Sequence, residues 1–256
     1  MSGNPYRNHT ETGHTGVGLR LVAVSTVLTC LALPVSAAKT FALPQGCDAF
    51  VTIQSHSCAV EHHFTCAGDP EGVKQRVSLS EDGMTYLGST NSETEWLNSY
   101  HPFTGHSEEL EPDPVDRASL SELLRTGKDS YDFKTLSDQI GTTRYVGEDR
   151  LTGEVITIDD VTLQQTEYHI TAFAEDGTEL WSSAGNEFVS AKWRTFIGGT
   201  GTVTVPGDQF DKNDSPLEFI FPGEPGFLSA DPKFDCGAIM SSAPVPSIKE
   251  TANDHL

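Results

Sequence analysis

The stretch between residues 142 and 205 constrains the fold more than any other part of the chain. It alternates short runs of β-branched and aromatic residues with turns at residues 152–153, 159–160 and 175–178. Runs of this composition, joined by Gly- and Asp-containing turns, are typical of antiparallel strands that follow one another as a meander. The sequence therefore predicts an all-β protein whose strands run up and down in chain order.

A change of pattern inside residues 161–174 predicts that the sheet is curved. The apolar side chains begin at the odd positions Val161 and Leu163 and continue at the even positions Tyr168 and Ile170. A switch by one residue within a long strand is what a β-bulge produces, and bulges bend sheets. We expect a bend near residues 164–166 and a meander curved into a barrel or half-barrel.

The first 37 residues have the pattern of an export signal. Arg20 precedes an apolar run over residues 21–33, which is too short to span a bilayer. Small residues then follow at Val35 and Ala37, which predicts cleavage after Ala37, with cleavage after Ala38 as the alternative. The sequence thus predicts a secreted or periplasmic protein with no stable membrane span once the signal peptide is removed.

The net charge limits the partners that the chain can bind. The formal charge of −21 becomes −22 after cleavage, because residues 1–37 carry Arg7, Arg20 and Glu11. An acidic surface repels phosphate backbones, so no nucleic-acid partner is expected. No motif implies a cofactor.

Removal of the signal peptide also makes the cysteine count even. Cys30 is lost with residues 1–37, which leaves Cys47, Cys58, Cys66 and Cys236. An even number of cysteines in an exported chain predicts disulfide bonds.

Residues 47–66 predict a hairpin that limits how the cysteines can pair. A two-residue turn at residues 56–57 would place Val51 opposite His62 and Ile53 opposite Val60. Side chains alternate between the two faces of a strand. One face would then carry odd-numbered residues of the first strand and even-numbered residues of the second, namely Cys47, Val51, Ile53, Cys58, Val60, His62, Phe64 and Cys66.

In this register Cys58 and Cys66 would lie roughly 26 Å apart along one strand, too far for a disulfide. The expected bridges are Cys47–Cys66 and Cys58–Cys236. If the turn lies elsewhere, Cys58–Cys66 with Cys47–Cys236 is the alternative. Either pairing ties the start of the domain to its end, which favours a single domain over residues 38–240 with a flexible tail at residues 241–256.

One short helix is expected at about residues 119–126. Ser119 and Glu122 form a capping box, and Gly127 suits the position after the last helical residue. A helix this short does not stand alone in water. We therefore expect it to pack on the sheet and to plug an open face or end.

The histidines near the hairpin cysteines do not predict a metal site. Oxidised cysteines cannot act as ligands, and His62 and His63 should point to opposite faces of their strand. His62 is expected to be a hydrogen-bonded core residue. His101 and His106 flank a turn and could meet across it, but they are expected to be surface turn residues.

Weak calcium candidates occur in the polar segment 207–215, which we expect to be a loop. Its oxygen-bearing side chains are Asp208, Asp211, Asn213 and Asp214. The segment does not match an EF-hand, because Pro216 stands at the glycine position and Pro222 at the position of the last Glu.

No nucleophile motif occurs in the chain, so no catalytic residue is predicted. Trp181, Trp193, Phe188 and Phe196 are expected to belong to the core. The sequence favours an exported, non-catalytic protein that binds a small apolar ligand or a partner in the curved sheet. An exported hydrolase using carboxylate and His chemistry, or a structural envelope-associated protein without a pocket, are the alternatives. Lipocalins and periplasmic half-barrel lipoprotein carriers have a similar plan, which implies architecture and no function.

Overall fold

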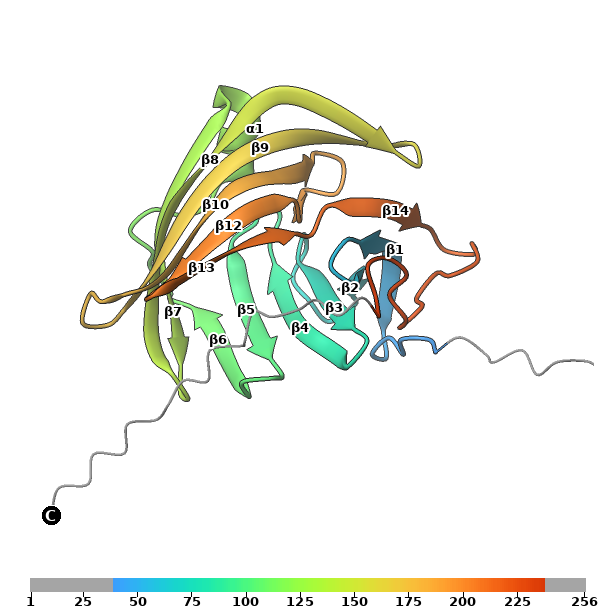
Figure 1. Ribbon diagram of the computed structural model, residues 1–256, viewed down its shortest axis with the longest axis horizontal. Helices are drawn as coiled ribbons and strands as arrows, with labels where there is room; N and C mark the ends of the chain where they lie inside the picture. The colour runs from blue at the N-terminus through green and yellow to red at the C-terminus, as the bar shows by residue number, and fades with distance from the viewer. Residues whose placement is uncertain (1–38, 238–256) are drawn as a thin grey trace, which may run out of the picture. The chain divides into compact units, whose positions relative to one another are not determined.

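A computed structural model describes residues 39–237 (Figure 1). The predicted signal peptide, the predicted flexible tail and the predicted domain limits at residues 38 and 240 lie outside these residues. The described part contains these elements: β1 (Cys47–Ser55), β2 (Ala59–Cys66), β3 (Lys74–Ser80), β4 (Gly83–Thr90), β5 (Trp96–His101), β6 (His106–Leu110), α1 (Leu120–Thr126), β7 (Lys128–Ser137), β8 (Gly141–Ile158), β9 (Val161–Ala174), β10 (Glu179–Ser190), β11 (Thr195–Ile197), β12 (Thr200–Val205), β13 (Asp208–Asn213) and β14 (Pro216–Ile220).

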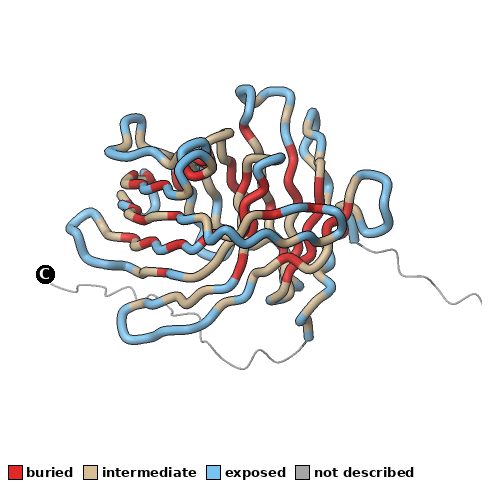
Figure 2. The backbone as a smooth tube through the Cα atoms, turned by 90° about the horizontal axis from the view of Figure 1, so that it is seen from above, coloured by how far each residue is buried: buried red, intermediate tan, exposed pale blue. Residues whose placement is uncertain are grey.

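All strands belong to one antiparallel sheet that curves into a half-barrel without closing. Its order is β13-β12-β10-β9-β8-β7-β6-β5-β4-β3-β2-β1-β14, and β11 pairs beside β10. The long strands β8 and β9 arch over the shorter strands of the first half (Figure 1). Buried residues lie mostly along the strands, and exposed residues lie mostly at the turns (Figure 2). The prediction of a curved antiparallel meander with one short helix is confirmed.

The hairpin of β1 and β2 differs from its predicted register. The loop between the strands has three residues, and the pairing shifts by one residue at Phe50. Cys47 still faces Cys66, but Val51 faces His63 and Ile53 faces Glu61. The predicted pairs of Val51 with His62 and of Ile53 with Val60 are therefore wrong.

The shift at Phe50 changes which side chains share a face. Val51 and Ile53 now point to the concave side and pack with Leu163, Phe188 and Phe219. Val60 and Phe64 instead point to the convex side, where they pack with residues of β3 and β4. One extra residue thus lets the same two strands supply apolar side chains to both faces.

Two end segments of the described chain cover the convex face of β1 and β2. Thr40 bridges to Ser229, and the Leu228 amide donates to the Thr52 hydroxyl at 2.9 Å. The side-chain amide of Gln54 bonds the backbone of Asp231 and Lys233. Because these partners replace water, polar side chains can be buried in the middle of β1.

The two disulfides join Cys47 to Cys66 and Cys58 to Cys236. This is the first of the two pairings considered from the sequence. The second bridge closes a separation of 178 residues and holds the C-terminal segment against the β1–β2 loop.

The helix α1 begins and ends as expected, but its cap differs in one contact. The Ser119 hydroxyl accepts the Glu122 amide, and Gly127 adopts a left-handed conformation after the last turn. The Ser119 amide donates to the carboxylate of Asp129 instead of Glu122. Leu120 and Leu123 are fully buried against residues of β8 and β10, so the helix covers one end of the half-barrel.

The second half of the sheet differs from the expected segments at two places. The turn expected at residues 152–153 is a bulge within the continuous strand β8, opposite Gln165 of β9. This irregularity lies at the bend predicted for residues 164–166. The polar loop expected at residues 207–215 contains the edge strand β13. No helix within residues 39–237 is long and apolar enough to cross a membrane.

Candidate functional site

A cavity of about 750 Å³ lies on the concave side of the sheet. It is lined by residues of β1 to β6 on one side and by residues of β7 to β13 on the other. The two sides differ in chemistry because the two halves of the sheet place their apolar side chains on opposite faces.

The second half of the sheet supplies an aromatic wall. Tyr131, Phe133, Tyr145 and Tyr168 form a buried cluster with Ile170. These residues alternate along β7, β8 and β9, so they share the concave face. A ligand in the cavity would meet aromatic rings on this side.

The first half of the sheet supplies a polar wall. Its apolar residues Val60, Val77 and Leu79 point to the covered convex face. The intervening residues Arg76 and Ser78 therefore point into the cavity, together with residues of β2 and β4. The cavity is amphipathic as a result.

Two tyrosines of the cavity wall lie flat across a glycine of the sheet. An added Cβ atom at Gly88 would meet the Tyr86 ring, and one at Gly147 would meet the Tyr131 ring at 2.6 Å. A larger residue at either position would push the ring into the cavity. The glycines therefore help to keep the cavity open.

An ion pair stands in the polar wall. The Arg76 guanidinium lies 3.8 Å from the Glu61 carboxylate and 4.6 Å from the centre of the Tyr86 ring. Burial opposes ionisation of Glu61, but Arg76 and the nearby His63 outweigh it and hold the pKa of Glu61 at about 2. Both members of the pair are thus charged at neutral pH.

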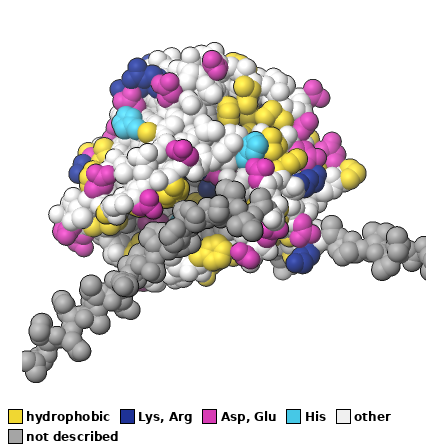
Figure 3. Space-filling model, viewed as in Figure 1, with side chains coloured by type: hydrophobic (Ala, Val, Ile, Leu, Met, Phe, Trp, Pro, Cys, Tyr) yellow, Lys and Arg dark blue, Asp and Glu magenta, His cyan; other side chains and the backbone are white. Residues whose placement is uncertain are grey.

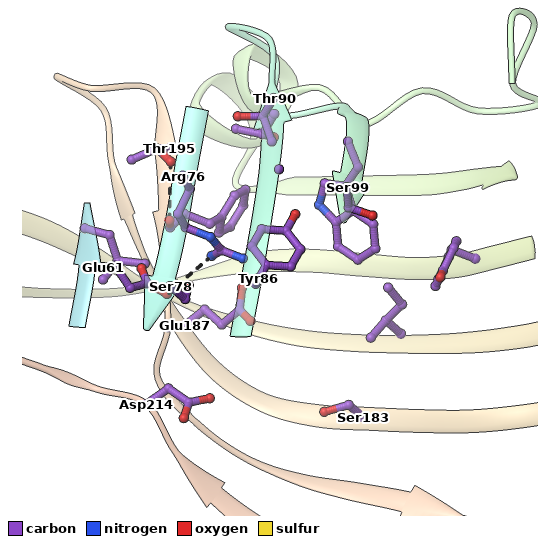
Figure 4. Close-up of a pocket in the computed structure, with 18 of the residues that line it drawn as sticks. Glu61, Arg76, Ser78, Tyr86, Thr90, Ser99, Ser183, Glu187, Thr195 and Asp214 are labelled. Carbon is purple, nitrogen blue, oxygen red and sulfur yellow. Dashed lines mark hydrogen bonds and ion pairs between the residues drawn. The ribbon is translucent and has the colours of Figure 1, made fainter. Parts of the chain in front are cut away.

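Glu187 on β10 is one of two carboxylates of the cavity that lack a partner in the described chain. Its carboxylate has no hydrogen bond or ion pair within residues 39–237, whereas Lys212 pairs with Asp214 at 3.5 Å. In Figure 4, Arg76, Tyr86 and Glu187 come from three different strands and point into one space. Burial raises the pKa of Glu187, while the positive charges of Lys212 and Arg76 oppose that rise.

Asp149 is a second carboxylate without a partner in the described chain. It is 8% exposed and lies on β8 at a concave position, in line with Tyr145 and Gly147. Burial and the negative charges of Glu187 and neighbouring carboxylates raise its pKa to about 8. Asp149 is therefore mostly protonated at neutral pH.

A cluster of His101, His106 and Glu108 forms at the far end of the polar wall. His101 and Glu108 line the cavity, and the two imidazole rings stack with centres 4.5 Å apart. Burial opposes ionisation of Glu108, but hydrogen bonds from His101 and Thr135 hold its pKa at about 2. The two histidines are partly buried and meet across the turn, which was the alternative to surface turn residues, because residue 101 faces residue 106 across the β5–β6 hairpin.

The four calcium candidates are distributed along and just after β13 instead of around a loop. Asp208 is exposed, Asp211 accepts a hydrogen bond from Thr202, and Asn213 accepts one from the Ser215 amide. Asp214 turns toward the cavity and pairs with Lys212. Within residues 39–237, the His, Cys, Asp and Glu side chains that lie close enough to share an ion do not include these aspartates.

The remaining predicted residues have mixed positions. His62 is fully buried and hydrogen-bonds the Thr52 hydroxyl at 2.9 Å, as expected of a core histidine, and His63 points to the opposite, concave face. Phe188 belongs to the core, but Trp181 and Phe196, expected there as well, line the cavity.

No protein-family model matches the chain, and no curated protein or solved structure shows significant similarity to it.

The cavity residues Arg76, Asp149 and Glu187 are absent from the site residues predicted from the sequence. The sequence contains a signal for two of them. Asp149 and Glu187 stand at positions of the strand alternation that buried residues occupy elsewhere on β8 and β10.

Proposed function

We propose that this protein is an exported, non-catalytic carrier or receptor that binds a small amphipathic molecule in the concave cavity. The molecule has an apolar body and a positively charged group. The observation that supports this most strongly is a cavity with one aromatic wall, one polar wall and a carboxylate, Glu187, that has no partner of its own.

The size of the cavity suits a small molecule. Ligand sites in proteins usually enclose about 300–1,000 Å³, and this cavity measures about 750 Å³. A body of some ten to twenty carbon atoms would contact the rings of Tyr145, Tyr168 and Trp181. Burial of apolar ligand surface against these rings stabilises the complex by about 25 cal/mol for each Å².

The charges of the polar wall favour a cationic group. Glu61 is balanced by Arg76, and Asp214 is balanced by Lys212. Glu61, Asp214 and Glu187 are three carboxylates beside two cations, Arg76 and Lys212, and burial raises the pKa of Glu187. A ligand ammonium beside Glu187 would favour its ionised form and pair with it, in a site of lower dielectric constant than water, whereas a ligand carboxylate would find no cation of its own.

The disulfides support an exported location. Disulfide bonds persist in oxidising compartments such as the periplasm and the extracellular space, and two bridges occur in the described chain. Together with the predicted signal peptide, they favour a secreted or periplasmic protein.

The proposal is tested by comparing three ligands with the same alkyl chain, namely dodecylamine, dodecanol and dodecanoate. Binding to the purified protein is measured by titration calorimetry below the concentration at which each compound forms micelles. We expect the amine to bind more tightly than the alcohol and the carboxylate to bind least.

The variant Glu187→Gln identifies the charge responsible. It should reduce the affinity for the amine by about tenfold or more, with little effect on the alcohol. Glu167→Gln on β9 removes one exposed carboxylate and is the matched control. Equal affinities of the wild type for all three ligands, or an equal loss in both variants, would contradict the role of Glu187.

A second candidate is an exported hydrolase. It is favoured by the raised pKa of Asp149, about 8, which would suit a proton-transfer group in the cavity. Within the described residues, however, the histidine–carboxylate contacts of the cavity involve Glu61 and Glu108, not Asp149. Screening of chromogenic ester and glycoside substrates, with Asp149→Asn as the comparison, distinguishes the two candidates. The cavity itself argues against a structural protein without a pocket.

A further inference from the structure

The hairpin of β5 and β6 brings two imidazoles and one carboxylate to the same face of the sheet. His101 pairs with His106, and Ser99 pairs with Glu108. Since alternate residues of a strand share a face, the three side chains converge at the end of the hairpin. One ligand atom of each lies within 4.8 Å of the others.

The ring of His106 is oriented by Thr104 in the turn. The Thr104 hydroxyl lies 2.7 Å from Nδ1 of His106 and donates its own proton to the His101 carbonyl at 3.4 Å. With its proton on that carbonyl, the hydroxyl accepts from Nδ1–H, and this tautomer of His106 has a lone pair on Nε2. That lone pair lies 3.9 Å from Oε2 of Glu108, so two electron-rich atoms face each other.

Glu108 is held from the opposite side. Its Oε1 accepts a hydrogen bond from Thr135 at 2.6 Å and another from the Tyr145 hydroxyl at 3.2 Å. These bonds direct Oε2 toward the two histidines. Hydrogen bonds that fix a ligating side chain in this manner are typical of metal sites.

His101 completes the set. Its Nε2 lies 3.4 Å from Oε2 of Glu108 and 3.2 Å from the Ser99 hydroxyl. Within residues 39–237, no group bonds its Nδ1, so the proton that Nε2 directs at Glu108 can move to Nδ1 when a metal ion takes the lone pair of Nε2. Two ligands about 2.1 Å from one metal ion lie roughly 3.0–3.4 Å apart in tetrahedral or octahedral geometry, close to the separations present here.

We propose that His101, His106 and Glu108 bind one divalent transition-metal ion, such as Zn²⁺, at the cavity wall. Two imidazoles and one carboxylate are a ligand set that suits such ions. Three protein ligands leave one or more coordination positions open. Because His101 and Glu108 line the cavity, an open position can face a molecule bound there.

The test uses the purified protein after dialysis against a chelator. Zn²⁺ affinity is measured by competition with a chromophoric chelator, and Co²⁺ is added separately to obtain its visible absorption spectrum. We expect one ion for each chain and a Co²⁺ spectrum without the intense charge-transfer band of thiolate ligands, since Cys47, Cys58, Cys66 and Cys236 form disulfides.

The variant His106→Ala should weaken Zn²⁺ binding by at least about tenfold. His169→Ala, which removes an exposed histidine on β9, is the matched control and should leave the affinity unchanged. Glu108→Gln should also weaken binding, and circular dichroism confirms that each variant folds.

Failure of the wild type to bind Zn²⁺ below millimolar concentration would overturn the proposal. So would equal affinities of the wild type and His106→Ala, because the three residues would then serve only as a hydrogen-bonded cluster. The amine titration without metal is a separate measurement, so loss of either site can be recognised independently.

Discussion

The buried carboxylate of Asp149 predicts an unusual dependence of stability on pH. Its pKa of about 8 in the folded protein compares with an ordinary value of 3.8. The folded state therefore binds this proton more tightly than the unfolded state does. The stabilising contribution of the protonated group is complete below pH 3.8 and is lost as the pH rises to about 8.

The size of this effect follows from the two pKa values. At about 1.4 kcal/mol for each pH unit, the interval from 3.8 to about 8 corresponds to about 6 kcal/mol. Water in the cavity screens part of the charge, so we expect about 3–5 kcal/mol. That is a large fraction of the total stability of a typical domain, about 5–15 kcal/mol.

The variant Asp149→Asn removes the titration and keeps the shape of the side chain. Urea unfolding is followed at several values between pH 4 and pH 8.5 for the variant and the wild type. We expect the variant to gain stability relative to the wild type as the pH rises. Asp208→Asn, which removes an exposed carboxylate on β13, is the matched control and should shift stability by less than about 0.5 kcal/mol. A difference between Asp149→Asn and the wild type that stays constant with pH would refute the reasoning.

Three further predictions concern the fold. Replacing both cysteines of the Cys58–Cys236 bridge by Ser should lower the free energy of unfolding by about 5 kcal/mol, against about 3 kcal/mol for Cys47–Cys66, because a disulfide that closes a longer loop restricts the unfolded chain more. Equal losses in denaturant unfolding would contradict this dependence on loop length. Burial lowers the pKa of His62 from 6.5 to about 4, so its contribution to stability is present above pH 6.5 and is lost as the pH falls through 4. His62→Gln should reduce that acid sensitivity by about 3 kcal/mol, and an unchanged acid unfolding profile would argue against it. Gly147→Ala should lower stability by about 2 kcal/mol or more, because the new methyl group meets both the His169 carbonyl of β9 and the Tyr131 ring. It should also weaken amine binding, because the ring must move; unchanged binding would show that the ring does not shape the cavity.

The sequence was sufficient for the fold class because the strand pattern is local. Apolar and polar side chains alternate along the strands of residues 142–205, and Ser119 and Gly127 predict where α1 begins and ends. The register of β1 and β2 was not predictable in the same way. It depends on the shift at Phe50, which is compatible with burial on both faces only because distant end segments cover the convex side.

Polar composition misled the prediction at β13. Asp208 and Asp211 suggest a loop, yet this edge strand pairs along one side only, with β12, and most of it is exposed. Strands at a sheet edge tolerate charged residues, which also discourage pairing with other chains. The acidic side chains spread over the face in Figure 3 fit the same pattern.

The cavity residues were hidden because they come from strands far apart in the sequence. Arg76 lies on β3 and Glu187 on β10, more than a hundred residues later. Nothing in a single strand indicates that such charges share a space. A charged residue at an inward-facing position of the alternating pattern also occurs where that face of the strand is exposed to water. The meeting of His101 and His106 depended instead on one detail, namely the length of the turn that joins β5 to β6.

The position of the bound amine tests the central claim most directly. Trp181 lines the cavity, whereas Trp193 packs against Phe50 and Phe219 outside the lining. Trp96 also lines the cavity, so it is replaced in both variants, one of which retains only Trp181 and the other only Trp193. Each is titrated with an alkylamine that carries bromine on its chain, which quenches fluorescence over short distances.

If the ligand occupies the cavity, the fluorescence of Trp181 falls in a saturable manner and that of Trp193 changes little. Equal quenching of both, or quenching of Trp193 alone, would place the ligand elsewhere and contradict the account.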